Sequence, residues 1–247
     1  MSIRPLVLLL LFSCLTITSM AAPPSHSGWN RLLKQYVNER GMVDYQGMKR
    51  DQARLKTYLD LLSQNPPTPA WSTNEQMAYW INAYNAFTVQ LILDHYPVAS
   101  IKAIGSAVQI PHVNTPWTEK FFSIGGRKMS LDNIANGTLR KQFNDPRIHF
   151  ALVNTAKSGP RLRNEAYTPA RLAEQLNEQG VDFLNDPTKN AIAPTRASLS
   201  KLFDWYKSDF TKDKRSVVYW VNRYSQTKMA DDIAISYLDF NWQLNEQ

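Results

Sequence analysis

The stretch STNEQMAYWINAYNAFTVQLILDHYP, residues 72–97, decides the fold of this chain. Ser72 and Glu75 have the spacing of a capping box, in which two side chains bond the free backbone N–H groups at the start of a helix. Apolar and aromatic side chains then recur with helical spacing until Pro97, which ends the pattern. The recurring face consists of Met77, Trp80, Ile81, Tyr84, Thr88, Leu91 and Ile92. The stretch therefore predicts one long helix.

A second face of this helix carries two amide side chains, Asn82 and Asn85, about one turn apart. Most of the helix is apolar, so these amides must find hydrogen-bond partners if they are buried. We therefore include both asparagines among the residues that would line a polar binding cleft.

Weaker helical patterns lie on both sides of this stretch. The spacing of apolar residues predicts further helices at residues 29–37, 55–62, 131–139, 168–184, 202–210 and 217–224. Thr168-Pro169 is expected to open one of them, with the hydroxyl as the cap and the proline in the first turn.

Segments with a strand-like pattern are short. Residues 121–131 read as a hairpin around Gly125-Gly126, a pair that supplies the positive φ angles of a tight turn. The apolar run at residues 147–153 and the segment at residues 233–238 predict two more strands. These patterns together predict an α+β fold, a single helix-rich domain over residues 22–247 with a small mixed or antiparallel sheet.

The N-terminus has the pattern of a signal peptide. Arg4 precedes an apolar stretch at residues 6–17, and Ser19 and Ala21 place small side chains where a signal peptidase recognises them. The apolar stretch is too short to span a bilayer. We expect cleavage after Ala21 and a periplasmic or secreted protein without a transmembrane segment. The alternative is lipidation of Cys14, which the bulky side chain two positions before it disfavours.

Composition excludes several classes of function. The chain has 28 Lys and Arg against 21 Asp and Glu, and Cys14 is its single cysteine. Cleavage removes Cys14, so the mature chain has no disulfide, no thiolate metal site and no cysteine nucleophile. The formal charge of +7 is spread along the sequence, which contains no nucleic-acid-binding motif. The four histidines, His26, His95, His112 and His149, lack metal-ligand spacing, so we expect neither a metal nor a cofactor.

The densest polar segment runs from Asn154 to Glu165 and follows the predicted strand at residues 147–153. Loops at the ends of strands often carry binding sites. Lys157, Arg161 and Arg163 would attract an anionic group there, and the alternative is a solvated surface loop. The sequence contains no Gly-x-Ser-x-Gly elbow, Walker loop or dinucleotide fingerprint, so it gives no support to the common hydrolase and nucleotide-binding classes.

Six short motifs stand out along the mature chain. They are WINAYNA at residues 80–86, PW at 116–117 with FFSIGG at 121–126, RIHFAL at 147–152, PRLRNEAY at 160–167, DWYKSDF at 204–210 and WQLN at 242–245. In this order they resemble the domain-of-unknown-function 547 family. The resemblance implies one helix-rich domain, found in exported bacterial proteins and in plant proteins, whose activity is not generally established.

The chain departs from the pattern of this family at four positions. Members usually have cysteines where this chain has Asn154 and Gly159, and Glu-His where it has Ala135-Asn136. A thiolate with a histidine partner is an activated nucleophile, and Glu, His and two Cys together would hold a soft metal. All four positions differ here, which indicates a degenerate site. The alternative is that the two cysteines merely form a disulfide in relatives.

Two functions of different classes remain. We favour a non-catalytic binding or interaction domain of the cell envelope, with a positively biased cleft for an anionic small molecule, an envelope polymer or a protein. Its lining would be Asn82, Asn85, Asn136, Asn154, Lys157, Arg161 and Arg163. The alternative is a hydrolase-like or transferase-like enzyme. In such an enzyme His149, Asp132 or Glu165 would be the acid or base, and Ser158 or Thr155 would be the nucleophile.

Overall fold

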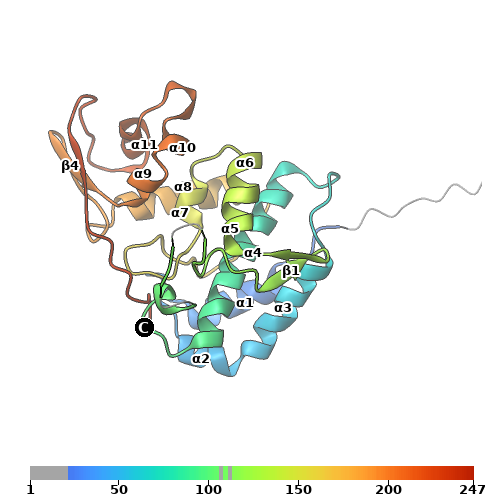
Figure 1. Cartoon of the computed structure of the whole chain (residues 1–247). Helices are drawn as coiled ribbons and strands as arrows, with labels where there is room; N and C mark the ends of the chain where they lie inside the picture. The colour runs from blue at the N-terminus through green and yellow to red at the C-terminus, as the bar shows by residue number, and fades with distance from the viewer. Residues whose placement is uncertain (1–21, 106–107, 111–112) are drawn as a thin grey trace, which may run out of the picture.

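A computed structural model describes residues 22–105, 108–110 and 113–247 of the chain (Figure 1). The predicted signal peptide, residues 1–21, and His112 lie outside the described residues. Within the described ranges, no helix combines the length and the apolar composition that crossing a membrane requires.

The predicted long helix is α4, Thr73–His95, which lies at the centre of the larger part of the molecule (Figure 1). Both bonds of its capping box are present. The Ser72 hydroxyl accepts from the Glu75 N–H, and the Glu75 carboxylate accepts from the Ser72 N–H. Buried residues lie on all sides of α4, as in a helix that is enclosed by protein.

Three helices precede α4 and cover part of it. Both α2 (Tyr45–Arg50) and α3 (Gln52–Gln64) contact α4, and α1 (Ser27–Tyr36) packs on α2 and α3. The sequence pattern predicted α1 and α3 but not α2, because six residues are too few for a helical period to be recognised.

The hairpin predicted around Gly125-Gly126 is confirmed. Strand β1 (Phe122–Ile124) pairs antiparallel with β2 (Arg127–Met129). The φ angles of the two glycines are 58° and 75°, as a tight two-residue turn requires. The Gly125 N–H also donates to the Ser63 carbonyl at 2.8 Å, which holds the hairpin against α3.

A helix with one wide turn follows the hairpin. It consists of α5 (Leu131–Ile134), the π-helical turn η2 (Ala135–Leu139) and α6 (Arg140–Gln142). Ser130 caps α5, as the sequence predicted. Turns of the π type are frequent at functional sites, and this one carries two of the four positions that depart from the family pattern.

The apolar run at residues 147–153 is a helix, so the predicted strand is wrong. Helix α7 covers Ile148–Ala151, and all four of its side chains are buried. A short run without a polar face has no period that distinguishes a strand from a helix. The Ile148 N–H donates to the Asp145 carbonyl, which begins a helical turn directly after the Asp145-Pro146 pair.

Helix α8 covers Leu172–Leu184 and begins later than Thr168-Pro169 predicted. The expected hydroxyl cap is absent, and the Thr168 N–H instead donates to the Gln175 side chain at 3.0 Å. Single 3-10 turns occur at η1 (Ile101–Ala103) and η3 (Lys212–Lys214).

The last part of the described chain contains a mixed sheet. Strand β3 (Ala191–Ala193) pairs antiparallel with β4 (Arg196–Leu199), which pairs parallel with β5 (Ile235–Tyr237). Between β4 and β5 lie α9 (Leu202–Trp205), α10 (Lys207–Phe210) and α11 (Val217–Tyr224). The described residues form a helix-rich α+β fold with two small sheets, as the sequence predicted.

The buried apolar side chains form two clusters. The N-terminal cluster comprises residues between 29 and 176 together with Leu244. The C-terminal cluster comprises Phe150 and residues between 183 and 229. Ile148 belongs to the first and Phe150 to the second, so the single turn of α7 joins the two clusters.

The end of the chain returns from the C-terminal cluster to the N-terminal cluster and finishes near α2 (Figure 1). The Leu244 N–H donates to the Ala99 carbonyl, and the Val43 N–H donates to the Asn245 carbonyl. The buried Tyr45 hydroxyl donates to the Asn245 side chain at 2.7 Å. We call residues 238–247 the C-terminal segment.

Asn82 and Asn85 bond the backbone of segments far along the chain. The Asn82 amide donates to the Tyr167 carbonyl at 2.8 Å and accepts from the Tyr167 N–H at 3.0 Å. The Asn85 amide donates to the Ala151 carbonyl at 3.0 Å and accepts from the Val153 N–H at 2.9 Å. Both asparagines are buried and line none of the cavities described below, so their part is to hold the fold together.

Asn85→Ala is expected to lower the free energy of unfolding by about 2–4 kcal/mol, because it leaves a buried N–H and a buried carbonyl without partners. Urea denaturation followed by circular dichroism measures this loss. Asn74→Ala, at an exposed position of the same helix, is the control and should cost less than about 0.5 kcal/mol. Equal small losses in the two variants would contradict the structural assignment of Asn85.

Candidate functional site

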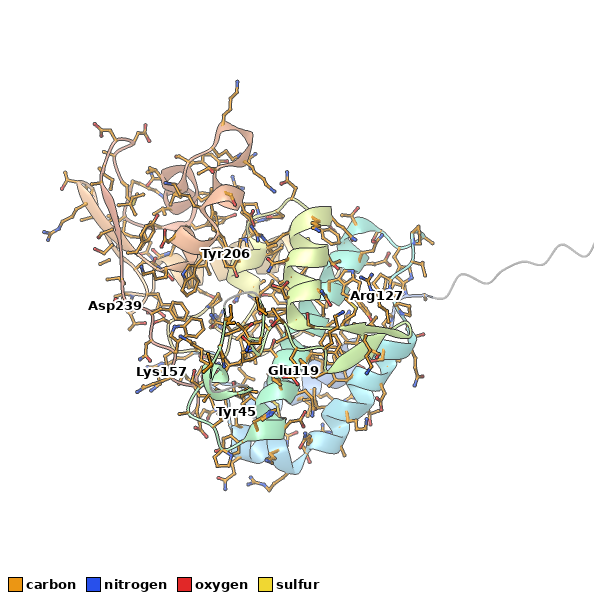
Figure 2. The ribbon with its side chains drawn as sticks, viewed as in Figure 1. Tyr45, Glu119, Arg127, Lys157, Tyr206 and Asp239 are labelled. Atoms are coloured by element: carbon orange, nitrogen blue, oxygen red, sulfur yellow. The ribbon has the colours of Figure 1, made fainter. Side chains whose placement is uncertain are left out.

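A cavity of about 540 Å³ lies between the two apolar clusters, and we call it the junction cavity. Tyr206, which lines it, is seen in Figure 2 where the two parts of the molecule meet. The lining side chains come from α4, α5, the η2 turn, α6, α7, α9 and the C-terminal segment, together with loops. They are Tyr84, Thr115, Trp117, Thr118, Asp132, Ala135, Asn136, Arg140, His149, Leu152, Asn154, Pro160, Leu202, Trp205, Tyr206 and Trp242.

One wall of the junction cavity is aromatic. The ring of Trp242 lies 5.8 Å from that of Trp117 and 5.7 Å from that of Trp205, measured between centroids. Trp205 is 45% exposed, and Trp117 and Trp242 are half-buried, so their rings remain partly open. Aromatic side chains with open faces and a few polar groups are the usual lining of a small-molecule site.

The polar wall is built on the η2 turn. The Asn136 amide donates to the Asp132 carboxylate, and its oxygen accepts from an Arg140 guanidinium N–H at 2.8 Å. This bridging amide fixes Asp132 and Arg140 on the side of the helix that faces the cavity.

His149 and Arg140 share one carboxylate, that of Asp209. His149 Nε2 lies 2.7 Å from Asp209 Oδ2. Arg140 donates to both carboxylate oxygens, at 2.5 Å from Nε and 2.8 Å from Nη2. The Tyr206 ring stacks on the imidazole at 3.8 Å, and the Arg140 guanidinium lies 5.2 Å from the centre of the Tyr206 ring. The four side chains form a packed group on the floor of the cavity.

The protonation of this group follows from its surroundings. Burial lowers the pKa of His149 below its usual value, and this outweighs the opposite effect of Asp209. Burial alone would raise the pKa of Asp209, but hydrogen bonds from His149 and Arg140 hold it well below its usual range. At neutral pH Asp209 is therefore ionised and His149 neutral. The carboxylate can only accept, so the imidazole proton lies on Nε2 and Nδ1 carries the lone pair.

The loop that carries Asn154 has an unusual backbone. Thr155 has a φ of 56°, in the left-handed region that a β-branched residue rarely adopts. Its carbonyl accepts from the Asn245 N–H at 3.0 Å, which ties the loop to the C-terminal segment. Backbone strain of this kind clusters at functional sites, and here it lies next to a residue of the cavity lining.

The candidate nucleophiles do not contact His149. The Thr155 hydroxyl donates to the Asn154 carbonyl at 2.7 Å, and Ser158 Oγ accepts from the Asn241 N–H at 2.9 Å. Among the hydrogen bonds of the described residues, none joins His149 to either hydroxyl. Of the predicted acids and bases, only His149 and Asp132 line the junction cavity. Glu165 lies apart from it and bonds Arg163 and Arg171.

The predicted cations also lie apart from the junction cavity. Lys157 and Arg161 line a second, wider cavity of about 1270 Å³, where Arg161 pairs with Asp182. Arg163 is buried and pairs with Glu165 at 2.5 Å and with Glu178 at 2.6 Å. The residues expected to line one cleft therefore lie in three places. Asn136 and Asn154 line the junction cavity, and the predicted cations lie in or beside the wider cavity. The two asparagines of α4 bond the backbone of other segments.

Several residues of the junction cavity escaped sequence reasoning. The motif DWYKSDF contains Trp205 and Tyr206, which line the cavity, and Asp209, which bonds His149 and Arg140 of the lining. Two aromatic residues and a carboxylate close together in a chain are a signal that would have pointed to them. Within the described residues, no group of three or more His, Cys, Asp or Glu side chains is placed to hold a metal ion.

One family model matches part of the chain. Residues 68–184 match the family model described as "Protein of unknown function, DUF547". The match extends from the residues before α4 to the end of α8, so it includes His149 and Asn154 but neither Tyr206, Asp209 nor Trp242. No curated protein and no solved structure matches the chain.

Asn154 and Gly159, two of the positions that depart from the family pattern, adjoin each other. A Cβ atom added to Gly159 would lie 2.0 Å from Asn154 Oδ1 and 3.0 Å from Asn154 Cγ. The asparagine thus occupies the space that any side chain at position 159 would need. In a disulfide each sulfur lies about 3 Å from the Cβ atom of the other residue, which is similar to the separation found here between Asn154 Cγ and that Cβ atom. The two differences from the family pattern are physically coupled.

Gly159→Ala is expected to lower the free energy of unfolding by about 1–3 kcal/mol, because its methyl group overlaps the Asn154 amide. The same substitution in an Asn154→Ala background should cost less than half as much, since the overlapping group is gone. A double-mutant cycle from urea denaturation gives the interaction energy directly. An interaction energy near zero would show that the two positions are independent.

Proposed function

We propose that the chain is a non-catalytic binding protein of the cell envelope, and that it holds a small uncharged molecule in the junction cavity. The support is a cavity of suitable size with open aromatic faces and few polar groups.

The observation that carries this proposal is the pairing of charges in the cavity. Arg140 and Asp209 neutralise each other, and burial keeps His149 uncharged. The remaining charged side chain of the lining is Asp132, which accepts from Asn136. An anionic ligand would therefore face a carboxylate, and the described lining offers no unpaired cation to balance it. For this reason we propose an uncharged ligand, where the sequence alone led us to expect an anionic one.

The proposal includes no catalysed reaction because of the hydrogen bonds around His149. Nucleophilic catalysis needs a hydroxyl or thiol within hydrogen-bond distance of the base. Ser158 and Thr155 bond other groups, and the described lining offers no hydroxyl bonded to the imidazole. The enzyme alternative would use His149 Nδ1 or the Asp132 carboxylate as a base on a bound ligand.

Location in the cell envelope rests on the N-terminal pattern alone. A basic residue, an apolar stretch at residues 6–17 and small side chains at positions 19 and 21 together favour export.

If the signal peptide is cleaved as proposed, the intact mass of the protein from the periplasm or the medium will correspond to a chain that begins at Ala22. Mass spectrometry of the full-length gene product, expressed in a bacterium with a secretion system, measures this. Retention of residues before Ala22, or a lipid attached to Cys14, would contradict cleavage after Ala21.

Three uncharged ring compounds of different classes test the binding proposal: indole, thymidine and cellobiose. We expect at least one to quench or shift the tryptophan fluorescence, because three tryptophans line the cavity. Benzoate and glucose 6-phosphate are the charged counterparts and should bind more weakly.

Ala135→Phe places a large side chain in the cavity and should weaken binding about tenfold or more, which corresponds to 1.4 kcal/mol. Ala173→Phe, at an exposed position of α8, is the matched control and should leave the affinity within about twofold. Equal affinities in the two variants, or tighter binding of the charged compounds, would contradict the proposal. Recovery of the ligand in altered form would favour the enzyme alternative.

A further inference from the structure

The aromatic wall of the junction cavity continues beyond the cavity itself. The Phe240 ring lies 4.5 Å from that of Trp242 and 4.9 Å from that of Trp205. Trp117, Trp242 and Trp205 follow one another in steps of 5.8 and 5.7 Å between ring centroids. We call these four side chains the aromatic ledge. Its three tryptophans line the cavity, and Phe240 extends it beyond the lining.

The rings of the aromatic ledge are inclined to one another. The interplanar angle is 65° between Trp117 and Trp242, 26° between Trp205 and Trp242, and 49° between Phe240 and Trp242. A flat heteroaromatic ligand binds best between two parallel rings, and the ledge offers no such pair. Rings that are tilted relative to one another suit a ligand with successive rings, each of which stacks one apolar face on one aromatic side chain.

Three side chains of the cavity lining each have a polar atom without a partner. Asp132 Oδ2, Asn154 Nδ2 and His149 Nδ1 have no hydrogen-bond partner among the residues that the structure describes. The carboxylate oxygen and the imidazole lone pair accept, and the amide donates. A hydroxyl group both donates and accepts, so a ligand with several hydroxyls would satisfy all three atoms.

Two aromatic faces at the cavity are occupied by cations of the chain itself. The Lys102 ammonium lies 5.1 Å from the centre of the Trp242 ring, and Arg140 occupies a face of Tyr206. One face of Trp242 and one face of Tyr206 thus already hold a cation of the chain, and an ammonium ligand would have to bind elsewhere on the lining.

We propose that the junction cavity and the aromatic ledge bind a neutral saccharide, with two successive pyranose rings stacked on the ledge and their hydroxyls bonded by Asp132, Asn154 and His149. This inference rests on the proposed function and specifies its ligand class. A pyranose ring presents C–H groups on its faces and hydroxyls at its edge, which is the division of apolar and polar groups that the cavity presents. Hydrolysis of glycosides generally requires two carboxyl groups at the bond. Asp209 is held by Arg140 and His149, so Asp132 is the one carboxylate of the described lining that no cation pairs.

Titration with three neutral disaccharides, cellobiose, maltose and N,N′-diacetylchitobiose, tests this inference. Tryptophan fluorescence gives the affinity, and saturation-transfer NMR on the sugar shows which ring protons contact the protein. We expect at least one disaccharide to bind, with the largest transfer to the protons on the ring faces.

Trp205→Ala is the decisive variant, because its side chain is exposed enough to be removed without unfolding the chain. It should weaken disaccharide binding about tenfold, as expected for the loss of one stacked ring. Tyr219→Ala, which removes a ring of similar exposure (41%) on α11, is the matched control and should leave the affinity within about twofold. Asp132→Asn keeps the shape of the side chain but replaces an acceptor by a donor, and should also weaken binding.

The outcomes separate this inference from the proposed function. If indole or thymidine binds at the cavity and none of the disaccharides does, the saccharide inference is overturned and the proposed function stands. If no uncharged compound binds, both are overturned. Equal disaccharide affinities in the Trp205 and Tyr219 variants would overturn the ledge as the binding surface. Release of monosaccharides would overturn the non-catalytic part of the proposed function.

Discussion

The rest of the structure depends on four hydrogen bonds made by two buried amides of α4. The backbone N–H and C=O groups inside a helix already bond each other. Only the side chains of the helix can therefore satisfy the backbone groups of segments that cross it. Asn85 satisfies the backbone at residues 151–153, and Asn82 satisfies Tyr167. The irregular loop between them is therefore anchored to α4 at both ends. Because that loop carries Asn154, the same bonds determine where one wall of the junction cavity lies.

The sequence predicted the elements whose signals are local. The capping box of α4 and the Gly-Gly turn of the hairpin act within a few residues, so they could be recognised without the fold. The run at residues 147–153 was misassigned because it is buried on all sides, and only the packing between the two clusters decides its conformation. The cavity lining runs from Tyr84 to Trp242, and no local pattern reveals that such distant residues meet.

The charge of the site could not be predicted from the sequence either, because it depends on which charged side chains pair in the fold. Lys157, Arg161 and Arg163 look like a cluster of positive charge when only their spacing is known. In the fold, Arg161 and Arg163 are paired with acidic residues of α8, and Lys157 points to a different cavity. Arg140 finds its carboxylate 69 residues later, at Asp209. A cluster of charged residues in the sequence therefore predicts the electrostatic potential of a site only where the residues that pair with them are also close in the sequence.

The return of the C-terminal segment to α2 has a consequence for the order of folding. The hydrogen bond between Tyr45 and Asn245 joins residues 200 positions apart, and Trp242 of the same segment completes the aromatic wall. Contacts of such long range form late, because most of the chain must be ordered before the loop closes. We therefore expect the junction cavity to be among the last features to form. A ligand that binds there would stabilise the native state and not the partly folded states that precede it.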